Sequence, residues 1–243
     1  MEKLFALRRD MFVEADLITV AVAQPDGTAV GALSSRWAHT ADGQRFLHVT
    51  TQFVGDAYRN GPIFRQSWAT HLETLYTSRW GFPVLTALKT YNPMVYCVMR
   101  SLGRLDGVDF YPSVDGVNSS TIEDAARRVA HALGEDHPFD PATGVISGIG
   151  VPADLYPEMP VSRDSEVNAY FEKTTQPGDR ILCMLSVPTK QAVANVLHAF
   201  VGSGRRKTGS RPGAGRGPLA AAVTPWSASR LSTTHNGIPG AEL

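Results

Sequence analysis

Two Asp-Gly dipeptides set between apolar runs constrain the fold of this chain more than any other feature. Asp26-Gly27 separates the β-branched run 17–23 from a second run at 28–33, and Asp42-Gly43 precedes a third run at 46–54. Asp-Gly tolerates the positive φ angles that tight hairpin turns require. The sequence therefore predicts three consecutive antiparallel strands.

A helix is predicted directly after the third strand. The chain turns through 55–61 and reaches Pro62. Proline is favoured at the first helical position because its missing N–H would have had no partner there. Apolar residues then recur at helical spacing over 62–77, and a short apolar run at 84–88 predicts a buried strand. A second helix is predicted over 93–102, ending at a glycine.

Periodicity and composition divide the chain into three parts. Residues 1–112 contain the strands and helices described above and end with a strand at 108–111. Residues 113–201 predict an α/β extension in the order helix, strand, helix, with its strand at 180–187. Residues 202–243 have six basic side chains, one acidic side chain and no periodicity. This last part is predicted to be a disordered basic tail.

The composition argues against several functional classes. The formal net charge is zero, and the body of the chain has no basic stripe, so no specific nucleic-acid partner is expected. No segment approaches the roughly 18 to 20 uncharged apolar residues of a membrane span, and the start lacks the pattern of a signal peptide. We therefore expect a cytoplasmic protein without membrane association. Cys97 and Cys183 are the only cysteines, too few for a disulfide framework or a cysteine zinc site, and no metal is expected.

The strand, turn and helix at 46–77 resemble the acyl-CoA binding motif of the GNAT superfamily of N-acyltransferases. That motif reads roughly Val-x-Pro-x-Tyr-Arg-x-x-Gly-x-Gly/Ala before a helix, and this chain matches it at Val54, Tyr58 and Arg59. The first hairpin looks like the family's second and third strands. The stretch from Asn92-Pro93 to Leu102-Gly103 is similar to the family's helix after its fifth strand. The resemblance covers about 95 residues, from 16 to 112.

The resemblance implies an α+β fold, a GNAT-like mixed and mostly antiparallel sheet flanked by helices, with the helix–strand–helix extension added. It also implies acetyl-CoA or another acyl-CoA as co-substrate. A helix start offers unpaired amides to a diphosphate, and an arginine adds a charge-assisted contact. In the family the fourth and fifth strands splay apart, and the pantetheine arm pairs with the fourth. The residues expected to bind the cofactor are Phe53, Val54, Arg59, Asn60, Gly61, Ile63, Phe64 and Asn92.

Several residues depart from the family pattern. Pro62 and Phe64 stand where the family has two small residues, and glycine there would permit close approach of the backbone to phosphate. Asn92 precedes Pro93 and is equally well explained as a helix cap. These departures weaken the match at the cofactor site.

Amine acylation needs a base for the amine and an acid for the leaving thiolate. Many relatives use a carboxylate on the fourth strand, but His48 is the only titratable side chain in 46–54 and is the candidate base. A structural role for this histidine is the alternative. The leaving-group acid in many relatives is a tyrosine, and the aligned position here is Met99. Tyr96, one helical turn earlier, is the candidate acid, with a place in the core as its alternative.

Three hypotheses follow. The first is an N-acyltransferase that moves an acyl group, foremost acetyl, from acyl-CoA to a small-molecule or protein amine. The second is a catalytically silent GNAT-fold binding or assembly module, motivated by Pro62, Phe64 and Met99. The third is a fragment that lacks the family's first strand, with an open edge at 17–23 that favours aggregation or a homodimer.

Overall fold

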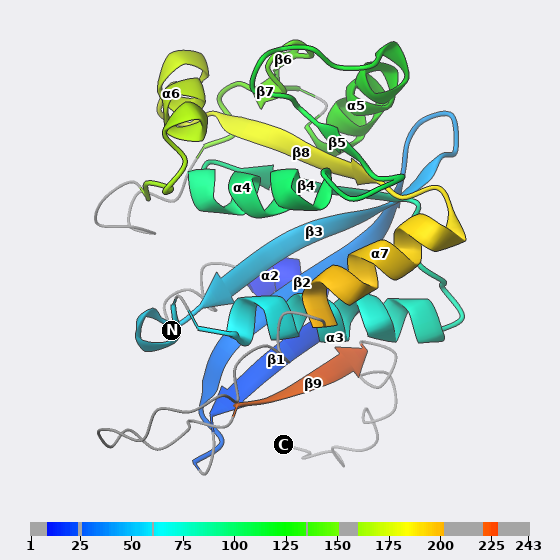
Figure 1. Ribbon diagram of the computed structural model, residues 1–243, viewed down its shortest axis with the longest axis vertical. Helices are drawn as coiled ribbons and strands as arrows, with labels where there is room; N and C mark the ends of the chain where they lie inside the picture. Colours follow the sequence, from blue (N-terminus) through cyan, green and yellow to red (C-terminus); the bar gives the residue numbers. More distant parts are fainter. Residues whose placement is uncertain are drawn as a thin grey trace, which may run out of the picture.

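The computed structural model describes residues 9–23, 26–59, 61–134, 136–150, 160–201 and 221–227. They form a nine-stranded sheet with the order β6-β7-β8-β4-β3-β2-β1-β9, and β5 pairs with β8 beside this path (Figure 1). Strands β3 and β4 are parallel, and the other pairs among the described strands are antiparallel. The prediction of an α+β protein with a mixed, mostly antiparallel sheet flanked by helices is confirmed.

The first three strands are the predicted hairpins. They are β1 (Leu17–Ala23), β2 (Ala29–His39) and β3 (Arg45–Val54). Gly27 and Gly43 have φ angles of +73° and +85°, which a residue with a side chain rarely adopts. Ser34 faces Thr51 whereas Ser35 faces Val49, so β3 contains one extra residue, a β-bulge.

The next elements also follow the sequence pattern. They are α3 (Ile63–Thr77), β4 (Leu85–Thr90), α4 (Pro93–Leu102) and β5 (Asp109–Tyr111). Proline 62 is the residue before the first helical one rather than the first itself. The α3 helix lies along β1 and β2, and the later helix α7 packs against α3.

Residues 113–201 complete the same sheet. Their elements are α5 (Ser120–Leu133), β6 (Phe139–Asp140), β7 (Val145–Ile146), α6 (Ser165–Thr174), β8 (Arg180–Ser186) and α7 (Lys190–Val201). Strand β8 pairs with β4 on one side and with β5 and β7 on the other. The ring of Phe200 on α7 stacks on Trp68 of α3 at 5.9 Å between centroids. The extension predicted from the sequence is therefore packed into the core.

The edge of β1 is covered by a strand from the C-terminal part of the chain. Strand β9 (Ala221–Ser227) pairs antiparallel with β1 along its whole length, from Leu17 to Ala23. The sequence predicted disorder over 202–243 and an open edge at 17–23, and residues 221–227 correct both expectations. The physical reason is that the backbone N–H and C=O groups of an edge strand are satisfied by any strand that reaches them. Residues 202–220 and 228–243 lie outside the described residues.

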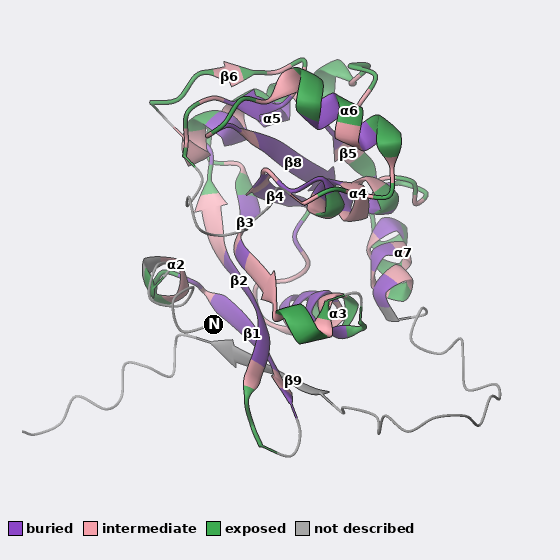
Figure 2. Ribbon diagram, turned by 90° about the vertical axis from the view of Figure 1, so that its left-hand side faces the viewer, coloured by how far each residue is buried: buried purple, intermediate pink, exposed green. Residues whose placement is uncertain are grey.

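The helices divide between the two faces of the sheet. Figure 2 shows α3, α4, α6 and α7 on one side, and α5 and the short α2 (Arg9–Val13) on the other. The larger core lies under the first group and includes Leu47, Trp68 and Tyr96. A second core under α5 includes Phe46 and Ala87. Within the described residues, no helix is both long and apolar enough to cross a membrane.

Candidate functional site

The parallel strands β3 and β4 separate shortly after they meet. They are paired at Leu47 with Thr86 and at His48 with Ala87. Strand β3 then continues to Val54 and β4 to Thr90, but no further pair joins them. We call this divergence, residues 49–54 of β3 and 88–90 of β4, the fork. On its other side β3 remains paired with β2 as far as Val54. Residues 49–54 therefore stay extended, while their edge toward β4 is unpaired.

The start of α3 follows β3 after a short turn. A 3₁₀ turn over Asp56–Tyr58 leads to Pro62, which precedes the helix and makes no side-chain cap. The first amides of a helix have no partner within it, and the first turn of α3 contains no acidic side chain. The positive end of the helix dipole therefore lies next to the end of β3, where it favours an anion.

The residues of the turn are positioned by backbone contacts. The amide of Gly61 donates to the carbonyl of Tyr58 at 3.2 Å, and a Cβ at Gly61 would lie 3.0 Å from that same oxygen. Glycine is therefore needed at position 61, because a side chain there would be too close to the carbonyl oxygen of Tyr58. The guanidinium of Arg59 forms an ion pair with Asp56 at 2.7 Å. Asn60, a predicted cofactor residue, lies outside the described residues.

The two apolar residues at the start of α3 face the protein interior. Ile63 is buried, and it packs in a small cluster with Ala21, Ala23 and Val30. Phe64 is partly buried and packs against the larger core. Val54 also contacts the small cluster. These side chains hold the end of β3 and the start of α3 together, and any ligand contact at the buried Ile63 would have to come from the backbone.

Asn92 caps helix α4. Its Oδ1 accepts a hydrogen bond from the amide of Met94 at 2.9 Å, and its own amide donates to Thr90 Oγ1 at 2.9 Å. The structure thus shows the cap that was the alternative reading of this residue. Asn92 lies two residues after the end of β4 at Thr90, so it is at the far end of the fork from Ala87.

His48 is the last residue of β3 that pairs with β4. Only 8% of it is exposed, and its Nδ1 has no hydrogen-bond partner. Burial lowers the pKa of His48 to about 3, with further contributions from the charges of Lys89 and Arg36. His48 is therefore a neutral imidazole with a free ring nitrogen at the point where the strands part.

Tyr96 lies in the core. It is fully buried, its hydroxyl donates to the carbonyl of Pro112, and its ring packs edge-on against Phe110 and Phe171. Burial raises the pKa of this phenol well above its usual value. The proton of Tyr96 is thus held by a backbone acceptor, an arrangement that does not favour the predicted role as an acid.

One functional candidate was not found from the sequence. Lys89 lies on β4 within the fork, and its Nζ donates to the carbonyl of Leu133 at 2.7 Å. Burial lowers the pKa of Lys89 to about 8, and the charges of Arg180 and Arg36 contribute. The predicted strand ended at Leu88, so Lys89 was not placed on it. The signal that could have identified Lys89 was a single charged residue directly after an apolar strand run.

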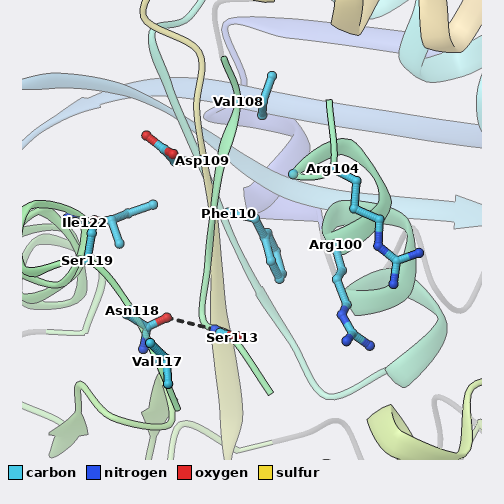
Figure 3. Close-up of a pocket in the computed structure, with 11 residues that line it drawn as sticks. Arg100, Arg104, Val108, Asp109, Phe110, Ser113, Val117, Asn118, Ser119 and Ile122 are labelled. Carbon is cyan, nitrogen blue, oxygen red and sulfur yellow. Dashed lines mark hydrogen bonds between the residues drawn. The ribbon is translucent and has the colours of Figure 1, made fainter. Parts of the chain in front are cut away.

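A separate hollow of about 290 Å³ lies beyond the end of α4 (Figure 3). Arg100, Arg104 and Phe110 line one side, and Asn118 on the other accepts a hydrogen bond from the amide of Ser113 at 2.8 Å. None of the predicted site residues lines this hollow. The guanidinium of Arg100 is bound by Asp164 and Glu166. The hollow is therefore distinct from the fork.

The part of the chain that the structure describes holds no group of three or more His, Cys, Asp or Glu side chains able to bind a metal ion. Comparison of the sequence with models of known protein families and with curated proteins gave no match.

Proposed function

We propose that this chain is a GNAT-type N-acyltransferase that transfers an acyl group, foremost acetyl, from acyl-CoA to an amine. The observation that carries the proposal is the separation of the parallel strands β3 and β4 after His48 and Ala87, in the strand that leads through a short turn to the start of α3. The resemblance predicted such a gap between these two strands, and it predicted the helix start as the diphosphate site. Continuous pairing from His48 to Val54 would have removed the basis for the proposal.

The donor would lie along the open edge of β3. Its diphosphate would accept hydrogen bonds from the first amides of α3. The ion pair between Arg59 and Asp56 is half exposed, and such pairs contribute little, so Arg59 can exchange Asp56 for a phosphate at small cost. The pantetheine arm would follow the backbone of 49–54 toward the fork. This direction brings the thioester to His48.

The chemistry requires a base close to the thioester. The amine nitrogen forms a C–N bond with the thioester carbon, the C–S bond breaks, and its electron pair leaves on the sulfur of coenzyme A. Neutral His48 would accept the proton that the amine loses. Burial disfavours the imidazolium, so His48 would hold this proton only transiently and would pass it to the departing thiolate. Tyr96 has no part in this proposal.

Titration calorimetry with acetyl-CoA tests donor binding. Arg65 is exposed in the first turn of α3, and Arg79 is exposed just beyond its last turn. Arg65→Glu places a negative charge beside the diphosphate site, and we expect it to weaken acetyl-CoA binding by about tenfold. Arg79→Glu makes the same change in charge at the other end and should leave affinity unchanged. Absence of binding to the parent protein at millimolar acetyl-CoA would refute the proposed function.

The second candidate is a silent GNAT-type module that binds acyl-CoA or a partner without turnover. The bond between Tyr96 and Pro112 favours it, because no other tyrosine proton is assigned to the leaving thiolate. Release of free coenzyme A in the presence of a broad set of amines distinguishes the two. Tight acetyl-CoA binding without thiol release would support the silent module.

A further inference from the structure

Three basic residues form a row across neighbouring strands where the fork begins. Arg36 of β2 is the cross-strand partner of His48 on β3, and His48 is the partner of Ala87 on β4. Side chains alternate between faces along a strand, so Lys89, two residues after Ala87, shares its face. We call Arg36, His48 and Lys89 the basic row.

The basic row lies on the face of the sheet opposite to α3. Leu47 and Val49, the neighbours of His48 in β3, belong to the core under α3, α4 and α7. Ala87 belongs to the core under α5. Figure 2 shows α2 and α5 apart from each other on this second face, with β2 and β3 between them. The proposed diphosphate site lies at the start of α3 on the first face, so an acceptor that binds the basic row would lie on the second face.

The row contains nitrogen atoms without acceptors. The Nε of Arg36 and the Nδ1 of His48 are buried and have no hydrogen-bond partner among the described residues. Lys89 donates to one carbonyl, and an ammonium group has further N–H donors. No carboxylate of the described residues lies within ion-pair distance of Lys89, whereas Arg36 is bound through NH1 to Glu14.

Such an arrangement is costly in the absence of an anion. A partly buried ammonium group without a counter-ion and a buried guanidinium N–H without an acceptor both lose hydration that nothing replaces. Burial is the main cause of the lowered pKa of Lys89, and the positive charges of Arg180 and Arg36 lower it further. An oxyanion placed between Arg36 and Lys89 would remove these costs.

We infer that the acyl acceptor is an amine that carries an oxyanion, a carboxylate or a phosphate, which binds to Arg36 and Lys89 while its amine lies at His48. This inference rests on the proposed function and specifies its second substrate. Neutral amines and plain alkyl polyamines would lack the group that the basic row binds. The acceptor oxyanion and the donor diphosphate occupy opposite faces of the sheet, so the two sites are separate.

The test uses matched pairs of acceptors with the full chain. Each of the common L-amino acids is compared with its α-carboxamide, and phosphoethanolamine is compared with ethanolamine. Turnover is followed as thiol release at saturating acetyl-CoA. Binding of the corresponding N-acetyl amino acids and amides is measured by calorimetry, which requires no turnover. We expect an acid or a phosphate to be preferred over its neutral partner by about tenfold or more. The acid and phosphate arms identify which oxyanion is used.

Variants locate the effect. Lys89→Gln and Arg36→Gln should each raise the KM for the acceptor by about tenfold and leave acetyl-CoA binding unchanged. Lys173→Gln, at an exposed lysine of α6, removes the same charge elsewhere and should change neither. If the unmodified protein does not bind acetyl-CoA, the proposed function is refuted. Acids and phosphates that bind no better than their neutral partners, or an unchanged acceptor KM in both variants, would overturn the inference about the acceptor.

Discussion

The imidazole of His71 on α3 is hydrogen-bonded through Nε2 to the hydroxyl of Ser35 on β2, at 2.7 Å. Its Nδ1 lies 2.9 Å from the hydroxyl of Thr19 on β1. All three residues are fully buried. A histidine hydrogen-bonded to two hydroxyl groups resembles a catalytic arrangement, but no substrate can reach these buried side chains. It connects α3 to two strands, and it thereby fixes the helix whose start forms the proposed diphosphate site.

Replacement of His71 tests this connection. His71→Leu leaves two buried hydroxyls without a partner, and we expect it to lower the free energy of unfolding by about 2–4 kcal/mol. The triple variant Thr19→Val, Ser35→Ala, His71→Leu removes every polar group together and should recover much of the loss, because no unsatisfied hydroxyl remains. Urea unfolding of the three proteins measures both effects. A triple variant less stable than His71→Leu would contradict the argument.

Stability should fall in mild acid because of two buried histidines. Burial lowers the pKa of both His48 and His71 to about 3, whereas an unfolded histidine titrates near 6.5. Between these values the unfolded chain binds protons that the folded chain does not, so the free energy of unfolding falls as the pH decreases. The slope reaches about 1.4 kcal/mol per pH unit for each histidine.

The pH effect is measured by urea unfolding between pH 8 and pH 4. The parent protein should be insensitive to these two groups above about pH 7 and should lose stability steadily below about pH 6. The triple variant without His71 retains His48 and should show a shallower slope. Identical slopes in parent and triple variant would show that His71 does not titrate in this way.

Gly103 is required by a close contact rather than by its backbone angles. It ends α4 with an ordinary helical φ of −65°, but a Cβ at this position would lie 2.2 Å from the Cβ of Phe110 on β5. Gly103→Ala should therefore destabilise the protein by about 1–3 kcal/mol, a cost typical of overpacking.

Gly134 supplies the control for Gly103. It follows α5, and a Cβ there would meet nothing closer than 3.6 Å, at Ile146. We expect Gly134→Ala to change the midpoint of urea unfolding little. Equal stability of Gly103→Ala and Gly134→Ala would mean that β5 shifts to make room, and the contact would then have no consequence.

Local patterns predicted much of the fold around the candidate site. Asp26-Gly27 and Asp42-Gly43 specify hairpin turns through backbone angles, and Pro62 marks a helix start, so each signal lies within a few residues of the structure it determines. The position of β8 between β4 and β5 depends on pairs far apart in the sequence, such as Leu88 with Cys183. No periodicity contains that information. The sequence therefore predicted most of the elements, but not the strands β6, β7 and β9 or the completion of the sheet.

The candidate site was harder to predict for the same reason. Helical spacing allowed Tyr96 to face either a cleft or the core, and only the contact with Pro112 decides for the core. The Nδ1 atom of His48 has no hydrogen-bond partner, and this depends on the residues of β2 and β4 that lie beside it. Lys89 became a candidate only when its strand was placed next to His48.

Removal of β9 tests how far the edge of β1 needs its cover. Strand β9 pairs with every residue of β1, including Thr19, which hydrogen-bonds His71. Truncation after residue 201 removes β9 and leaves the backbone of Leu17–Ala23 open, and an open edge favours pairing with a second copy. We expect the elution volume of this variant in size-exclusion chromatography to shift to larger size as its concentration rises. Truncation after residue 227 keeps β9 and should elute as the full chain does. If both truncated chains elute and unfold like the full chain, β9 contributes nothing to closing the sheet.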